Sequence, residues 1–291
     1  MSVEVWVLMA AGIAALVVGL VFVRARFRAA GAGKVLVLGP VFEAVALAIF
    51  SAEHFAAARL LSGIVPRWLP GPLFWTYFFG VALALAAISF VVWRGVRWSS
   101  VALVMFFWII VLTVDLPGLP KGMHDRFFWI LTVRETCFGA GALVLAGSVW
   151  GRPALVRVGR VIVGAVMVFY ALEHFLHPRN VPGVPLQKMT PGWIPGAVGI
   201  ASFVGVVLLV CGVWILVGRR VRLAAAFAGA MLVLLVLLFY VPIAVTEMHT
   251  PLAVEGLNYV GDTLLFGATV LLAGWGAESE QVPGKVADIR P

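Results

Sequence analysis

Charged side chains are scarce in this chain: Asp, Glu, Lys and Arg make up 12% of its 291 residues, whereas 63% are hydrophobic. A water-soluble domain carries about twice that share of charge, so this class is excluded. The only cysteines, Cys137 and Cys211, fall at unrelated positions. We expect them to pack as small apolar side chains rather than to form a disulfide or a redox pair. The sequence also has no phosphate-binding loop, dinucleotide-binding glycine motif or nucleophile elbow.

Long apolar runs are abundant, and each is long enough, or nearly so, to cross about 30 Å of hydrocarbon as a helix. The runs are continuous rather than alternating, which favours helices over a β-barrel. They lie near residues 3–23, 35–52, 73–93, 98–116, 127–148, 158–176, 194–217, 223–245 and 257–275. The composition therefore predicts an all-α polytopic membrane protein with about nine transmembrane helices.

The formal net charge of +8 reflects membrane topology rather than nucleic-acid binding. Most Lys and Arg residues fall in alternate connections, at 24–34, 94–97, 152–160 and 219–222, and in the tail. The positive-inside rule places these segments in the cytoplasm, with the N-terminus outside and the C-terminus inside. The first apolar run lacks a basic leader and a cleavage site, so we expect a retained anchor.

The second half of the chain repeats the first. Glu53-His54-Phe55 returns as Glu173-His174-Phe175, an offset of 120 residues, and the offset grows to 125 and then to 127 towards the end. We therefore expect an anchor and basic loop (1–34), two four-helix repeats (35–150 and 156–276) and a disordered cytoplasmic tail (277–291). Because four is even, the repeats should form parallel bundles related by a pseudo-twofold axis along the membrane normal.

Histidines and carboxylates recur in both repeats at the expected outer end. A Glu-His pair ends the first helix of each repeat, a Met-His pair lies between the third and fourth helices, and a carboxylate lies within the fourth. These elements predict one ligand pocket per repeat. The first pocket would be lined by Glu53, His54, His124 and Glu135, and the second by Glu173, His174, His249 and Asp262.

Glu135 and Asp262 are the candidate proton carriers, because an ionisable group inside a membrane helix is costly to keep. Arg134 adjoins Glu135 and has Gly261 as its counterpart; neighbours on a helix do not face each other, so we expect it to point elsewhere. The alternative is a purely structural role, in which the histidines only hydrogen-bond to backbone groups at helix ends. A metal ion is a further alternative, with His54, His124, His174 and His249 as ligands, although their spacing matches no metal motif.

Two longer segments carry a family resemblance. Phe169 to Pro178 with Thr190 to Gly196, and Ala52-Glu-His-Phe55 with Pro66 to Trp75, resemble a branch of the DoxX-like membrane proteins. The resemblance implies a four-helix membrane unit, here fused in tandem over about residues 35–276. It also implies association with thiosulfate:quinone oxidoreduction and oxidative-stress complexes.

The leading functional prediction is the binding of a quinone-like or other lipid-soluble ligand, as a subunit of or accessory to a redox system. The partners expected are the lipid bilayer, a quinone and a redox protein, with no nucleic acid. The alternatives are a non-enzymatic carrier of lipids or small hydrophobic molecules and a periplasmic-side metal-binding membrane protein. We expect a bacterial-type inner (plasma) membrane as the location; whether the chain is an enzyme stays open.

Overall fold

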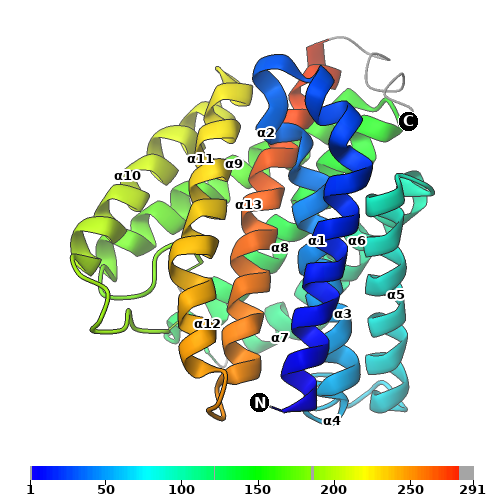
Figure 1. Ribbon diagram of the computed structural model, residues 1–291, viewed down its shortest axis with the longest axis vertical. Helices are drawn as coiled ribbons and strands as arrows, with labels where there is room; N and C mark the ends of the chain where they lie inside the picture. The colour runs from blue at the N-terminus through cyan, green and yellow to red at the C-terminus, as the bar shows by residue number, and fades with distance from the viewer. Residues whose placement is uncertain (1, 121, 185–186, 282–291) are drawn as a thin grey trace.

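The computed structural model describes residues 2–120, 122–184 and 187–281, and the all-α prediction is confirmed for this part of the chain (Figure 1). Within these described ranges, nine helical segments are long and apolar enough to cross a membrane. They are α1 (Val3–Ala29), α2 with α3 (Lys34–Val37, Gly39–Ala56), α5 (Pro72–Val92), α6 to α7 (Val96–Ile110, Leu116–Gly118), α8 (Arg126–Val149), α9 (Pro153–Leu176), α10 (Ala197–Leu216), α11 with α12 (Val221–Leu235, Val241–Glu247) and α13 (Ala253–Gln281). The short α4 (Ala58–Leu61) and η1 (Gly31–Gly33) lie in connections.

The last helix is longer than the apolar run that predicts it. It begins at Ala253 and continues to Gln281, so the first five residues of the expected disordered tail, 277–281, are helical. The rest of that tail, residues 282–291, lies outside the described residues.

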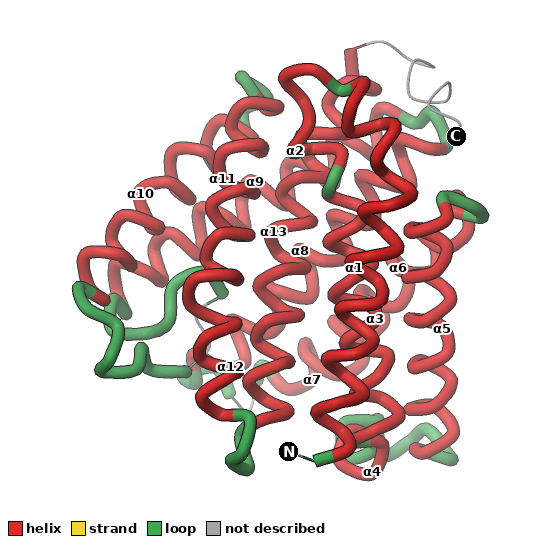
Figure 2. The backbone as a smooth tube through the Cα atoms, in the orientation of Figure 1, coloured by secondary structure: helices red, strands yellow, loops and turns green. Residues whose placement is uncertain are grey.

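The helices cross the molecule side by side, and their connections gather at two ends (Figure 2). We call the end with connections 57–71, 119–125, 177–196 and 248–252 the loop end; it also carries the N-terminus, in the lower part of Figure 1. The opposite end, with connections 30–33, 93–95, 150–152 and 217–220, is the basic end.

Equivalent helices of the two halves begin at equivalent residues. Gly71 and Gly196, 125 positions apart, have φ values of 70° and 69° and precede α5 and α10. Each half also contains one π-helical turn, at Val111–Asp115 (η2) and Val236–Tyr240 (η3). Pro117 and Pro242 follow each turn by two residues. Proline lacks an N–H donor and its ring crowds the carbonyl four residues earlier, which explains a widened turn at both places.

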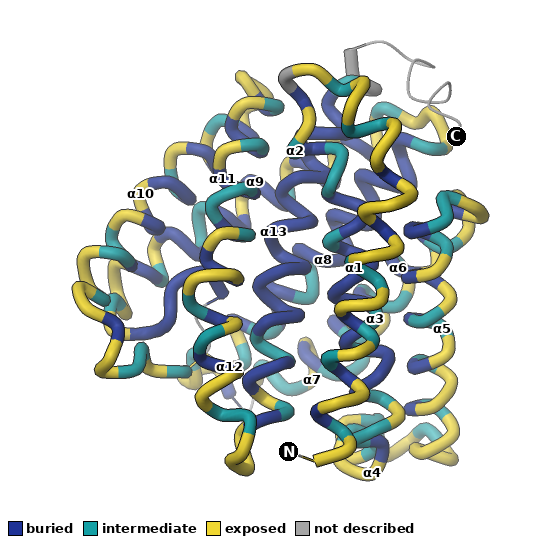
Figure 3. Tube along the Cα trace, in the orientation of Figure 1, coloured by how far each residue is buried: buried dark blue, intermediate teal, exposed yellow. Residues whose placement is uncertain are grey.

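The two halves interlock. α3 packs along α13 of the other half, and α9 packs in the equivalent way along α8. α13 is the central helix: it contacts α3, α8, α9 and α11, and its apolar stretch is buried throughout, as the dark tube in Figure 3 shows. From Leu264 to Ala277 this helix is apolar on almost every face, and such a stretch belongs in a buried position.

The N-terminal helix lies on the outside of this arrangement. α1 packs on α3 along one narrow face, where Gly12 and Gly19 lie against Ile49 and Val41. A side chain at either glycine would begin within 3 Å of those residues, so the glycines permit the close approach of the two helices. Most of its other residues are exposed, as expected for a surface that faces lipid.

Candidate functional site

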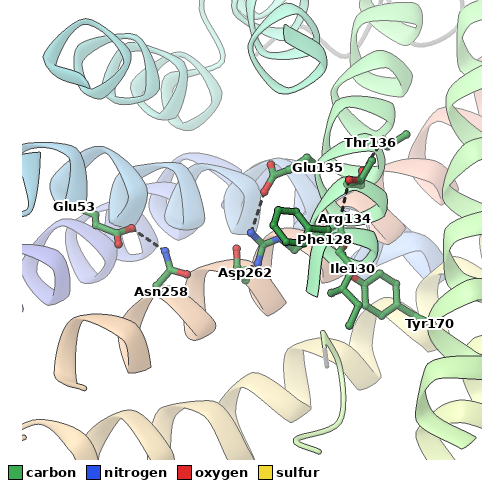
Figure 4. A network of polar contacts seen from close by, with 10 residues as sticks. Glu53, Phe128, Ile130, Arg134, Glu135, Thr136, Tyr170, Asn258 and Asp262 are labelled. Atoms are coloured by element: carbon green, nitrogen blue, oxygen red, sulfur yellow. Dashed lines mark hydrogen bonds and ion pairs between the residues drawn. The ribbon is translucent and has the colours of Figure 1, made fainter. Parts of the chain in front are cut away.

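A buried arginine joins the two halves of the molecule. Arg134 of α8 forms an ion pair through Nη1 with Asp262 of α13, and its Nη2 lies 2.9 Å from Oε1 of Glu135 (Figure 4). Arg134 and Asp262 are buried, and Glu135 is partly exposed. Arg134 lies eight residues into α8, about 12 Å from the start of that helix at the loop end. Glu135 and Asp262 are equivalent residues of the two halves, so a single guanidinium serves both.

The expectation that Arg134 points away from Glu135 is wrong. The rule for adjacent helical residues concerns the directions of their Cβ atoms. An arginine side chain is long enough to turn back, and its planar fork offers two separate N–H groups to two carboxylates. Since charges are costly in an apolar interior, a pair of carboxylates beside one guanidinium is the arrangement that lowers this cost.

A second contact extends the polar region along α13. Asn258 lies one turn before Asp262, and its Nδ2 donates to Oε2 of Glu53, on α3, over 2.8 Å. Glu53 is buried and interacts electrostatically with Arg134. The carboxylate that ends the first helix of the first half is therefore bound by the last helix of the second half (Figure 4).

Asp115 completes this region. It ends the π-helical turn η2, is buried, and interacts electrostatically with Glu135 and Arg134. Its Oδ2 has no hydrogen-bond partner among the described residues. We call Glu53, Asp115, Arg134, Glu135, Asn258 and Asp262 the central polar cluster. It holds four carboxyl groups and one guanidinium, so its cation cannot neutralise all of its acids.

His54 and His174 have the same local geometry in the two halves. Nδ1 of His54 lies 2.7 Å from the carbonyl oxygen of Phe50, and Nδ1 of His174 lies 2.6 Å from that of Tyr170. Because a carbonyl only accepts, each Nδ1 carries the proton and donates it. For Nδ1 of each ring, this contact agrees with the structural alternative, in which helix-end histidines hydrogen-bond to backbone groups.

Glu173 does not join the central polar cluster. Its Oε2 accepts from Nε of Arg126 over 2.5 Å and lies 3.9 Å from Nε2 of His177. Arg126 begins α8, so this contact also joins α9 to a helix of the other half. Glu53 and Glu173, although equivalent in sequence, each bind a residue of the opposite half.

The remaining predicted site residues lie at the surface. His124 is exposed beside an open hollow of about 540 Å³ formed by Pro120 and residues 122–126, and His249 is exposed in the connection before α13. The structure therefore assembles Glu53, Glu135 and Asp262 with one another, and leaves His124 and His249 outside. Glu135 and Asp262, which were expected in two separate pockets, both contact Arg134 in one cluster shared between the halves. In the described part of the chain, no group of three or more His, Cys, Asp or Glu side chains could hold a metal ion.

Three members of the cluster are absent from the predicted pockets. Arg134 carried a signal, since it is a charged residue in an apolar run with glycine as its counterpart. Asn258 carried a fainter one, because it lies four residues before Asp262 and hence on the same helix face. Asp115 has Tyr240 as its counterpart, so the repeat gives no indication of a role for this position.

Comparison of the chain with protein-family models, with curated proteins and with solved structures finds no match. The resemblance to DoxX-like proteins therefore stays a prediction.

Proposed function

We propose that the protein binds a quinone-like, lipid-soluble ligand within the membrane, as a subunit of or accessory to a redox system, and that the central polar cluster exchanges protons with it. The observation that carries the proposal is the composition of the cluster: four carboxyl groups share one guanidinium in an apolar interior. Carboxyl groups that outnumber their cations can hold and release protons, and a general acid or base needs this property.

The members of the cluster would have different roles. Arg134 fixes Asp262 and Glu135 through separate N–H groups and so acts as a positioning residue. Glu135 is the carboxylate best placed to meet a ligand, since its side chain is 15% exposed and that of Asp262 only 3%. Asp262 would then be the inner carboxylate, which the shared guanidinium holds beside Glu135.

A second candidate function, the carriage of a lipid or small hydrophobic molecule, is favoured by a groove elsewhere. A groove of about 350 Å³ runs between α1, α3 and α5, and alanine and aliphatic side chains line it apart from Ser51. Oγ of Ser51 already donates to the carbonyl of Gly80 over 2.8 Å. The groove thus offers an apolar chain contact area and gives a headgroup little to bind. Mass spectrometry of an organic extract of the purified protein separates the two functions: an isoprenoid quinone supports the first, and phospholipid alone supports the second.

Proton exchange is tested by calorimetric titration of the full chain in nanodiscs with decylubiquinol, in buffers of different ionisation enthalpy. We expect the binding enthalpy of the unaltered protein to vary with the buffer, because protons move on binding. Glu135→Gln combined with Asp262→Asn should abolish that variation. Glu255→Gln is the matched control, since Glu255 is an exposed carboxylate of the same helix α13. An unchanged buffer dependence in the double variant contradicts the proton role.

The proposed orientation places the loop end outside a bacterial-type plasma membrane and the basic end in the cytoplasm. Cysteines introduced at the exposed residues Arg67 and Arg219 mark the two ends, and the native Cys137 and Cys211 are buried. In intact cells, a membrane-impermeant maleimide should label Arg67→Cys and spare Arg219→Cys until the cells are opened. Labelling of Arg219→Cys in intact cells would contradict this orientation and place the basic end outside.

A further inference from the structure

The two equivalent histidines differ in what their second ring nitrogen meets. Nε2 of His174 accepts a hydrogen bond from the backbone N–H of Gly183 over 2.9 Å. Nε2 of His54 has no hydrogen-bond partner in the part of the chain that the structure describes. Both rings are oriented by the same constraints, an Nδ1 bond to the carbonyl four residues earlier and a Cβ packed against a glycine, Gly80 or Gly205. The two Nε2 atoms therefore occupy equivalent positions in the two halves.

Gly183 reaches His174 because its loop enters the bundle. Residues 180–184 are all buried, and we call them the inserted loop. Two backbone hydrogen bonds hold the loop. The N–H of Val181 donates to the carbonyl oxygen of Lys188 over 3.0 Å, and the N–H of Thr190 donates to the carbonyl oxygen of Arg179 over 2.9 Å.

The position of Gly183 admits only glycine. Its φ is 121°, and a Cβ there would lie 3.3 Å from the Tyr240 hydroxyl and 3.1 Å from Cγ2 of Thr263. The inserted loop thus fills the space between α9, η3 and α13 at the loop end.

The first half has no inserted loop. Its equivalent connection, residues 57–71, is shorter by five residues, the step by which the repeat offset grows from 120 to 125. It forms α4 and turns near the surface. α9 packs along α13 in the second half, whereas α3 and α8 are not a packed pair in the described structure.

The side chain that faces the inserted loop also changes. Tyr240 in the second half is replaced by Asp115 in the first, at the same residue of the π-helical turn. The buried Oδ2 of Asp115 lacks a hydrogen-bond partner, as stated above. The first half therefore has two acceptors without partners among the described residues, the imidazole Nε2 of His54 and Oδ2 of Asp115. They belong to the residues equivalent to His174 and Tyr240, which in the second half face the inserted loop.

We infer that the first half binds its ligand at the position equivalent to the inserted loop, and that this ligand is a hydroxylated apolar molecule of the hydroquinone class. The inference rests on the proposed function and names the reduced form as the preferred ligand. The neutral imidazole of His54 donates through Nδ1, so its Nε2 can only accept. A hydroquinone offers O–H donors, as Gly183 offers its N–H to His174. A quinone offers only carbonyl acceptors, so it would form no hydrogen bond with Nε2 of the partly buried His54.

The test is anaerobic calorimetric titration of the full chain in nanodiscs with decylubiquinol and decylubiquinone, which share one scaffold. We expect the unaltered protein to bind the quinol about tenfold more tightly, the effect of one or two hydrogen bonds. His54→Phe and Asp115→Asn should each reduce this ratio towards one. Asp115→Tyr, which copies the second half, should weaken the binding of both forms by occupying the site.

His174→Phe is the matched control. It removes the histidine of the second half and should keep the preference for the quinol. Equal affinities for the two forms in the unaltered protein contradict the inference and leave the proposed function standing. The inference is also contradicted if the preference for the quinol survives in both His54→Phe and Asp115→Asn, or if it is lost in His174→Phe alone. If neither form binds to the unaltered protein, the proposed function fails together with this inference.

Discussion

Arg134→Met is expected to destabilise the protein by roughly 3–5 kcal/mol, the usual cost of removing one partner of a buried ion pair. The guanidinium binds Asp262 and Glu135 at once, so its loss leaves two neighbouring carboxylates without a cation. Methionine keeps most of the side-chain length and the apolar contacts, so the loss of stability measures the effect of removing the charge. The measurement is thermal or denaturant unfolding of the purified protein in a fixed detergent.

Arg94→Met is the matched control, because Arg94 is exposed at the basic end and its change should be nearly neutral. A further variant identifies the cause. When Arg134→Met is combined with Glu135→Gln and Asp262→Asn, the total cost should be smaller than for Arg134→Met alone, since no uncompensated charge remains. If Arg134→Met unfolds at the same temperature or denaturant concentration as Arg94→Met, the ion pairs of Arg134 do not stabilise the fold.

The second large effect is expected at Gly159, where α9 meets α8. A Cβ at Gly159 would lie 2.6 Å from the carbonyl oxygen of Ala140 and 3.1 Å from the backbone nitrogen of Val144. Backbone atoms in a packed helix cannot move aside as a flexible side chain can. Gly159→Ala should therefore push the two helices apart and cost about 3 kcal/mol, the upper part of the usual range for overpacking.

Gly199→Ala provides the control with the same chemical change. Gly199 also lies in a helix, α10, but a Cβ there would have no atom within 4 Å. Alanine favours a helix over glycine by up to about 1 kcal/mol, so this variant should be neutral or slightly more stable. Unfolding in one detergent compares the two, and equal stabilities would contradict the packing argument.

The nine helices were predictable because each depends on local sequence. A continuous apolar run must satisfy its own backbone in a membrane, and the prolines and glycines at its ends, such as Gly71 and Gly196, limit its length. The repeat was visible for the same reason, since equivalent turns need equivalent residues.

The partners of the duplicated acids were not predictable from local sequence. Treating each repeat as a unit placed Glu53 beside Glu135 and Glu173 beside Asp262. In the structure, Glu53 binds Asn258, Glu173 binds Arg126, and both contacts cross between the halves. The repeat determines which helices each half contains. Whether an acid binds a residue of its own half or of the other half depends on how all the helices pack.

The inserted loop was hidden for a different reason. The sequence shows five additional residues in one connection, and extra residues in a loop are usually found at the surface. Whether they enter the bundle depends on space left between helices, which no single segment encodes. The contact of Gly183 with His174 could be seen only once the structure placed the loop.

The ion pair between Arg134 and Asp262 spans 128 residues of sequence, and this separation has a consequence during synthesis. At about 5–20 residues per second, translation needs roughly 6–26 s to produce Asp262 after Arg134. For that interval α8 carries a guanidinium whose main counter-ion does not yet exist. The nascent helix would have to wait near the lipid headgroups or beside an insertion factor, and the arrival of α13 would release it into the bundle.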